Sequence, residues 1–221
     1  MKNGEGPWDK YWTGDDDHTW WKNPTPDVLE FIASQSPVER PDVLDLGCGL
    51  GRHAIAFARA GFSVTASDAS QSAVSHLTEW AEALSLDIRA VVCDVLSDLL
   101  PEDGFDIVLA YNVIYHGYRH QLFAAVDRVR RLLRPNGLFY FTCPTREDGK
   151  YGFGREVAPH TFMSGKSVIP GDIHYFADEE DLDKLFSGFV QIDRDKMEGY
   201  WDNKGTRQFY STWRVIARKR A

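Results

Sequence analysis

The sequence predicts an α/β domain, in which strands and helices alternate around one sheet. Between residues 42 and 142, short β-type runs alternate with helical patterns, which is typical of a parallel sheet with crossover helices. The first run leads directly into closely spaced glycines and then into a helix. Two β-rich runs, 190–197 and 208–217, are separated by residues 199–205 and predict an antiparallel pair near the end of the chain. A length of 221 residues fits a single domain over residues 1–221.

The expected elements follow from hydrophobic periodicity and from the residues that interrupt it. Helices are predicted where apolar residues recur every three or four positions, and strands where short apolar or alternating runs end at turn residues. The continuous apolar run 105–111 is typical of a strand buried on both faces, and Pro135-Asn136-Gly137 is expected to end a helix. The predicted helices are Asp27–Ser34, Gly51–Ala60, Gln71–Leu84, Gln121–Leu133 and Asp178–Phe186, and the first five strands are Asp42–Leu46, Ser63–Ser67, Ile88–Val92, Phe105–Tyr111 and Leu138–Thr142.

The composition limits the classes of partner. Apolar residues make up 43% of the chain, enough for a substantial core, and the net charge is −8. This acidic balance opposes binding to nucleic acid or to an anionic membrane, and no apolar run reaches the roughly 20 residues that span a bilayer. The beginning of the sequence shows no signal-peptide pattern, and the three cysteines have neither disulfide nor metal spacing. We therefore expect a cytoplasmic protein with reduced thiols and no metal site.

Residues 43–51, Val-Leu-Asp-Leu-Gly-Cys-Gly-Leu-Gly, form the most informative segment. Glycine allows a positive φ and lets a ligand lie against bare backbone. The helix that follows presents free amide groups and partial positive charge at its N-terminus, which suits a carboxylate or a phosphate. The loop is therefore predicted to hold a small ligand at the carboxyl end of the first strand.

The same loop differs from the dinucleotide-binding fingerprint. That fingerprint requires a third small residue, and the bulky cation Arg52 stands at this position. Asp45, two residues before Gly47, would repel a pyrophosphate and attract an ammonium group. These two residues argue against an NAD(P)-dependent oxidoreductase. Measuring whether the protein binds NAD would test this alternative.

Residues 45–51, Asp-Leu-Gly-Cys-Gly-Leu-Gly, closely resemble the first motif of class I S-adenosylmethionine (SAM) dependent methyltransferases, and the resemblance continues in order and spacing over residues 40–143. It implies a three-layer α/β sandwich with a seven-stranded, mostly parallel sheet of order 3-2-1-4-5-7-6, whose last strand is antiparallel. It also implies that SAM is the methyl donor and that S-adenosylhomocysteine (SAH) is the product.

Residues at the ends of later strands extend this resemblance. Asp68 would accept hydrogen bonds from both ribose hydroxyls, although an acid at this position also suits a helix N-cap. The resemblance assigns the adenine amino group to Asp94, for which a surface turn is the alternative, and the methionine ammonium to a backbone carbonyl near Asn112. The expected cofactor-binding residues are Asp45, Gly47, Cys48, Gly49, Gly51, Asp68, Ala69, Asp94, Val95, Asn112 and Val113.

Two segments outside this core carry many aromatic residues and histidines. Residues 1–25 are predicted to form an aromatic cover over the pocket, and residues 144–176, which lack periodicity, a lid or substrate insertion. Tryptophans near a terminus would equally serve to fix that terminus to the core. The expected substrate residues are Tyr11, Trp12, Trp20, Trp21, Tyr151, Arg155, His160 and His174.

The implied reaction is an in-line displacement at a sulfonium, in which orientation and exclusion of water supply much of the acceleration. A general base is needed only for a protonated acceptor, and His116 is the expected base because it follows the cofactor-facing end of the fourth strand. The segment 151–176 resembles small-molecule methyltransferases of the tellurite-resistance and ubiquinone-biosynthesis type. This resemblance implies a small-molecule acceptor, and the expected assembly is a monomer or a homodimer.

Three alternatives for the activity stay open. A SAM-binding module without catalysis would bind the cofactor and turn over no acceptor. A nucleic-acid methyltransferase is opposed by the acidic balance and by the sequence Asn-Val-Ile-Tyr at residues 112–115, where base-amino methylating enzymes often carry Asn/Asp-Pro-Pro-Tyr/Phe. A protein acceptor is the third alternative.

Overall fold

The computed structural model describes residues 7–13, 19–35, 40–163, 169, 171–203 and 206–221. Of residues 7, 19, 20, 202, 203 and 206 it describes the backbone alone. Among the described residues, no helix combines the length and the apolar character that crossing a bilayer requires.

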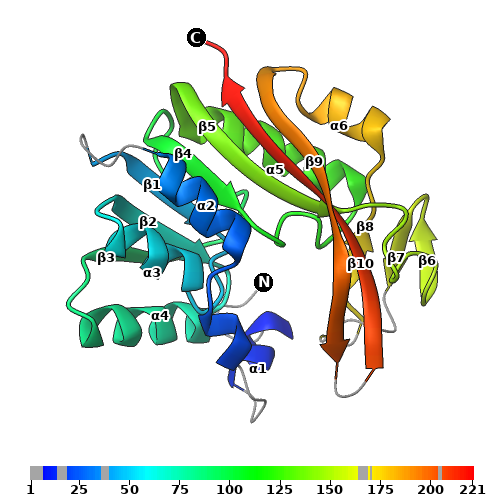
Figure 1. Ribbon diagram of the computed structural model, residues 1–221, viewed down its shortest axis with the longest axis horizontal. Coiled ribbons are helices and arrows are strands. Elements are labelled where there is room, and N and C mark those ends of the chain that lie inside the picture. Colours follow the sequence, from blue (N-terminus) through cyan, green and yellow to red (C-terminus); the bar gives the residue numbers. More distant parts are fainter. Residues whose placement is uncertain (1–6, 14–18, 36–39, 164–168, 170, 204–205) are drawn as a thin grey trace.

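Seven strands form the central sheet, in the spatial order β3-β2-β1-β4-β5-β10-β9 (Figure 1). Neighbouring strands from β3 to β5 are parallel, whereas β10 is antiparallel to both β5 and β9. This is the predicted order 3-2-1-4-5-7-6 with a reversed last strand, which is therefore confirmed. The strands are β1 (Asp42–Leu46), β2 (Ser63–Asp68), β3 (Ile88–Val92), β4 (Phe105–Ala110), β5 (Leu133–Pro144), β9 (Phe189–Asn203) and β10 (Thr206–Lys219).

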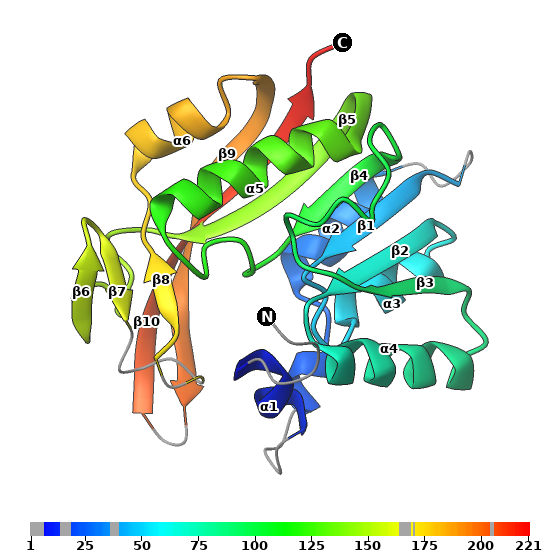
Figure 2. The same ribbon diagram turned by 180° about the vertical axis from the view of Figure 1, so that it is seen from behind.

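Helices cover both faces of this sheet, so the architecture has three layers (Figures 1 and 2). The helices α2 (Pro26–Ser34), α3 (Arg52–Arg59) and α4 (Gln71–Ala83) pack on one face, and α5 (Arg119–Leu132) and α6 (Glu179–Leu185) on the other. Strand β5 contributes to both cores because successive side chains of a strand point to opposite faces. Phe139 and Phe141 lie in the core beneath α5 and α6, while Tyr140 lies in the core beneath α2 and α3.

Strands β1 and β3 have the predicted bounds, and the junction between α5 and β5 differs from the prediction. The helix ends at Leu132, and Leu133 already pairs with Phe105 of β4. The register then shifts, because Leu138 pairs with Ile107. Pro135-Asn136-Gly137, expected to terminate the helix, instead lies inside β5 as an irregularity, where Asn136 has a φ of +66°. The positive φ of Asn136 accommodates the extra residues within the strand.

The terminal pair of strands is longer than predicted and extends past the edge of the sheet (Figure 1). Gly199 was expected in the connection, yet it lies within β9 opposite Tyr210 of β10. A Cβ atom at Gly199 would lie 2.8 Å from the Tyr210 hydroxyl oxygen. Glycine therefore belongs to this strand because the tyrosine ring needs the space, and it does not mark a turn.

Two segments without clear periodicity also form regular structure. The segment 144–176 contains a separate antiparallel sheet of β6 (Arg155–Ala158), β7 (Thr161–Met163) and β8 (Ile173–Tyr175). Near the N-terminus lie α1 (Pro7–Thr13) and a 3-10 helix, η1 (Thr19–Lys22). Helix α1 lies beside α4 and beyond the carboxyl ends of the parallel strands (Figures 1 and 2).

Candidate functional site

The glycine loop between β1 and α3 has the backbone that its sequence predicts. Gly47, Gly49 and Gly51 have φ angles of +69°, +53° and +89°, all in the region that favours glycine. The amides of Gly47 and Cys48 both donate to the carbonyl oxygen of Ser67 in β2, at 2.7 and 2.9 Å. A Cβ atom at Gly47 would lie 2.0 Å from a methyl carbon of Val113, so the loop and the residues that follow β4 are in direct contact.

Asp45, the acid before the loop, is buried and supports the start of α3. Its Oδ2 atom accepts a hydrogen bond of 2.9 Å from the amide of Ala54, one of the unpaired amides in the first turn of that helix. Burial disfavours the charged carboxylate and raises the pKa of Asp45 to about 7. This carboxyl group therefore titrates near neutral pH, unlike an exposed aspartate.

Asp68, at the end of β2, joins the loop to α4. One carboxylate oxygen accepts from the amide of Gly49 and the other from the amide of Ser70, both at 2.9 Å. Burial raises the pKa of Asp68, and these amide bonds act in the opposite direction. A carboxylate has about four lone-pair sites. The amide of Ala69 also acts on this carboxylate, so these bonds leave capacity for at least one further donor.

The end of β3 lies directly beside the end of β2. The amide of Cys93 donates to the carbonyl oxygen of Asp68 at 2.9 Å. Asp94 follows at the surface, where its carboxylate accepts from the amide of Leu96 at 2.9 Å. Asp94 is thus close to Asp68 along the same sheet edge, and it also stabilises its own turn, as the surface-turn alternative predicts.

Asn112 follows β4 in a left-handed conformation with a φ of +54°. Two hydrogen bonds with Thr142 of β5 stabilise this conformation. The amide of Asn112 donates to Oγ1 of Thr142 at 2.7 Å, and the same hydroxyl group donates to Oδ1 of Asn112 at 3.1 Å. Thr142 could not be predicted from the sequence, because no local motif relates two residues that are 30 positions apart.

The N-terminal segment lies over the glycine loop. Asp9 of α1 accepts from the Ser70 hydroxyl at 2.8 Å and from the Ser72 amide at 3.0 Å, at the beginning of α4. The ring of Trp12 packs against Gly49. These contacts place α1 between the loop and solvent.

Aromatic side chains of this segment form one cluster. Trp12 contacts Tyr11 and Trp21, with ring centroids 4.8 and 5.5 Å apart, and the indole nitrogen of Trp21 donates to the Tyr11 hydroxyl at 2.9 Å. The guanidinium of Arg52, the residue that departs from the dinucleotide fingerprint, lies 5.3 Å from the centre of the Trp21 ring. The structure thus brings together Tyr11, Trp12 and Trp21; the side chain of Trp20 lies outside the described residues.

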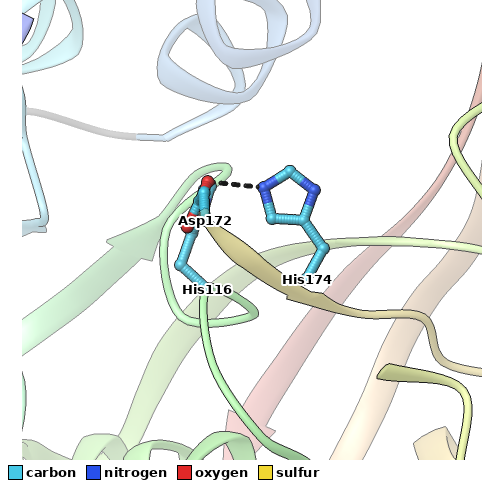
Figure 3. A group of neighbouring side chains, drawn as sticks. All are labelled: His116, Asp172 and His174. Atoms are coloured by element: carbon cyan, nitrogen blue, oxygen red, sulfur yellow. Dashed lines mark hydrogen bonds and ion pairs between the residues drawn. The ribbon is translucent and has the colours of Figure 1, made fainter. Parts of the chain in front are cut away.

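A second group of polar residues gathers beyond the end of β4 (Figure 3). Oδ2 of Asp172 lies 2.9 Å from Nδ1 of His116 and 2.7 Å from Nε2 of His174. The three side chains are only 14%, 8% and 3% exposed, for His116, Asp172 and His174 respectively. Burial opposes the charged form of Asp172, yet the hydrogen bonds from both histidines hold its pKa well below the usual value. Burial lowers the pKa of His174.

This group connects the N-terminal segment with the second sheet. The ring of Trp8 in α1 meets His116 edge-on at 4.9 Å, and Tyr115 stacks on His116 at 4.4 Å. Two of the predicted residues, His116 and His174, are thus brought together. Asp172 could not be predicted from the sequence, because it lies in a segment without periodicity, 56 positions from His116.

The remaining predicted substrate residues lie around β6 and β7. The Tyr151 hydroxyl is 2.8 Å from Nδ1 of His160, and the Tyr151 ring packs edge-on against Phe176 at 5.4 Å. Phe176 also meets the ring of His174 at 6.3 Å, which links this pair to the buried group. Arg155 is exposed, and its guanidinium contacts the sulfur of Met163 at 3.8 Å.

Comparison with known proteins identifies relatives of this arrangement. A family model described as a methyltransferase domain matches residues 43–137. The chain is 28% identical to the ubiquinone biosynthesis O-methyltransferase of Rickettsia prowazekii (strain Madrid E), over 74% of this chain and 68% of the relative.

Solved structures share the fold. TehB from Haemophilus influenzae superposes with a TM-score of 0.69 and 17% identity, over 96% of this chain and 67% of that protein. A Burkholderia thailandensis 1,6-didemethyltoxoflavin-N1-methyltransferase, with bound 1,6-didemethyltoxoflavin and SAH, superposes with a TM-score of 0.68 and 22% identity, over 96% and 84%. The matched domain and the similar sequences identify a methyltransferase domain that resembles those of ubiquinone biosynthesis O-methyltransferases, and the solved structures share the Rossmann-like fold that the glycine motif predicts for a SAM-dependent methyltransferase.

Proposed function

We propose that this methyltransferase transfers the methyl group of SAM to a small-molecule acceptor. The observation that carries the proposal is the position of His116. It lies four residues after Asn112, in contact with Trp8 of α1 and with His174 of the second sheet. Two segments that are not part of the cofactor-binding core thus meet at the cofactor end of β4. We place the acceptor between them.

The proposed cofactor contacts are those that the family resemblance implies, and the geometry of the loop supports them. Asp68 has at least one lone pair left for the ribose hydroxyls after it has accepted backbone amides. Asp94 lies at the neighbouring strand end, where it would meet the adenine amino group. The methionine ammonium would lie near Asp45 and the backbone at Asn112, and the bare backbone of the loop would contact the rest of the cofactor.

Three observations support a small acceptor. Helix α1 and its aromatic cluster lie over the loop, so a polymer would have to displace them to reach the cofactor. The net charge of −8 opposes association with nucleic acid. The names of two similar proteins refer to small molecules, ubiquinone and 1,6-didemethyltoxoflavin. We further propose that the enzyme acts in the cytoplasm as a monomer or homodimer; its three cysteines are free and buried.

The chemistry would be an in-line displacement. The bond between sulfur and the methyl carbon breaks as the acceptor–methyl bond forms, and the sulfonium charge disappears with release of neutral SAH. A protonated acceptor must also lose its proton. Nε2 of His116 would receive that proton, because Nδ1 is engaged by Asp172.

The test is a transfer assay with the full chain and SAM labelled in its methyl group. Candidate acceptors are a library of phenols, thiols, amines and nitrogen heterocycles, compared with peptides and transfer RNA. We expect label in one class of small molecule and stoichiometric formation of SAH. Label in peptide or RNA alone would overturn the proposal, and SAM binding without turnover of any acceptor would favour a non-catalytic module.

A further inference from the structure

We propose that His116, Asp172 and His174 form a binding site for a divalent transition-metal ion. Their donor atoms, Nδ1, Oδ2 and Nε2, all lie within 4.8 Å of one another. The two nitrogens are 2.9 and 2.7 Å from the same carboxylate oxygen. With metal–ligand bonds of about 2.1 Å, adjacent ligand atoms are roughly 3 Å apart in an octahedral site and roughly 3.4 Å apart in a tetrahedral site. Both nitrogen–oxygen pairs are therefore close to the spacing of neighbouring octahedral ligands, and a small outward shift would give the tetrahedral spacing.

The fold holds these donors in place through its backbone. His116 and His174 face each other across an isolated antiparallel β-bridge, and the amide of Tyr175 donates to the carbonyl oxygen of Tyr115 at 3.0 Å. Asp172 and His174 are two positions apart at β8, so their side chains leave the same face of the chain. Figure 3 shows the three side chains converging from the β4–α5 loop and from β8.

Packing fixes the orientation of the rings as well. His116 stacks on Tyr115, and His174 meets both Tyr115 and Phe176 edge-on or nearly so. Ligands whose side-chain torsions are already restricted lose little entropy when an ion binds. The site is thus organised before it meets its ligand, and its hydrogen bonds explain how the same residues are satisfied without an ion.

The donor set indicates the class of ion. Two imidazoles and one carboxylate suit first-row divalent ions such as Zn²⁺, Co²⁺, Fe²⁺ or Mn²⁺, and not Ca²⁺, which prefers oxygen ligands alone. Among the residues that the structure describes, this cluster offers three protein ligands. Three protein ligands are characteristic of sites that keep a position open for water or substrate. The proposed site contains no cysteine, and its three ligands come from two segments that are distant in the sequence. The spacing of the cysteines therefore does not argue against it.

This ion would act on the acceptor side of the reaction, a role that rests on the proposed function. An acceptor hydroxyl or thiol bound at the open position would have a lowered pKa and would lose its proton to solvent. The resulting oxygen or sulfur anion would form the bond to the methyl carbon as the bond to the SAM sulfur breaks. The ion would thus replace His116 as the group that makes the acceptor nucleophilic, and the acceptor would be a hydroxyl or thiol compound.

The experiment measures the ion directly, without SAM or acceptor. Full-length protein without a histidine tag is treated with a chelator, dialysed and titrated with CoCl₂ and with ZnCl₂, by visible absorption and by calorimetry. We expect one ion per chain, with Co²⁺ absorption bands of a protein-bound ion. Asp172→Asn and His174→Gln, which retain similar shape, should weaken binding by more than about 100-fold while circular dichroism stays unchanged.

The matched control is His120→Ala, a histidine that is exposed in the first turn of α5. It should bind one ion as the unmodified protein does. If either cluster variant fails to fold, His116→Gln replaces it as the third independent ligand variant. No stoichiometric binding by the folded protein would overturn the proposal and leave the cluster as a hydrogen-bonded support for His116 as base.

Binding that persists in the cluster variants would also overturn the proposal, since the ion would then lie elsewhere. Neither outcome depends on methyl transfer, so failure of the metal site and failure of the proposed function are told apart. A protein that binds the ion and turns over no acceptor would contradict the proposed function alone.

Discussion

The indole ring of Trp12 lies so close to Gly49 that a Cβ atom at that glycine would be 3.1 Å from Cζ2 of the ring. The central glycine of the cofactor loop and the aromatic N-terminal segment are therefore in direct contact. A substitution at either position should therefore disturb the packing of the other and change the affinity for SAM.

Gly49→Ala should impair both stability and SAM binding. The φ of Gly49 is +53°, which costs a residue with a Cβ roughly 1–2 kcal/mol, and the new methyl group would press on Trp12. Urea denaturation and calorimetric titration with SAM measure the two effects. Gly152→Ala is the matched control, because its φ is +78° but no atom lies within 4 Å of the added Cβ. It should lose similar stability and keep its SAM affinity. Normal SAM binding by Gly49→Ala would contradict a ligand on this loop.

Asp68→Ala should weaken SAM binding by about 10-fold or more. A hydrogen bond to a charged group contributes about 1.5–3 kcal/mol, and the variant would also release the amide of Gly49. Calorimetry gives the affinity, and Asp87→Ala, an exposed acid between α4 and β3, is the control. Equal affinities of the two variants would mean that Asp68 serves only the backbone.

Asp45→Asn should raise the stability of the protein above pH 7. The pKa of Asp45 is about 7 in the folded protein and about 4 in an unfolded chain, so between these values the folded state binds one more proton. The free energy of unfolding then falls with rising pH, by up to about 1.4 kcal/mol per pH unit. Asparagine still accepts the Ala54 amide and does not titrate.

Urea denaturation of Asp45→Asn and the unmodified protein at pH 4.5, 6 and 8 tests this linkage. The advantage of the variant should grow from pH 4.5 towards 7 and then level off. The same variant should bind SAM more weakly, since an amide lacks the charge that attracts the ammonium. Parallel stability curves, as expected for the exposed control Asp87→Asn, would show that Asp45 is ionised throughout.

Asp9→Ala should loosen the N-terminal cover and reduce turnover more than SAM affinity. Asp9 accepts from Ser70 and Ser72 at the start of α4, and without it α1 loses its polar anchor. Hydrogen exchange of residues 7–13 should become faster, and addition of SAH and acceptor should slow it less than in the unmodified protein. Lys10→Ala, an exposed position of the same helix, should change neither. Unchanged turnover by Asp9→Ala, or by a chain that lacks residues 1–22, would limit this segment to packing.

Much of the fold follows from contiguous residues alone. Strands β1 and β3 have the predicted bounds, and the sheet order is the one that the resemblance of the glycine motif implied. These features are local. The periodicity within a segment predicts a strand or a helix, and closely spaced glycines predict a turn with positive φ angles. The backbone conformation of the glycine loop was predictable for the same reason.

The acceptor side depended on contacts between residues far apart in the chain. Asp172 meets His116 across 56 positions, and Asp9 meets Ser72 across 63. The strands β6 to β8 that bring Asp172 to the site have only three or four residues, too few to display a period. The sequence by itself determined a SAM-binding α/β sheet. Only the tertiary structure decided which histidines and carboxylates stand together, because their proximity arises from chain topology and packing.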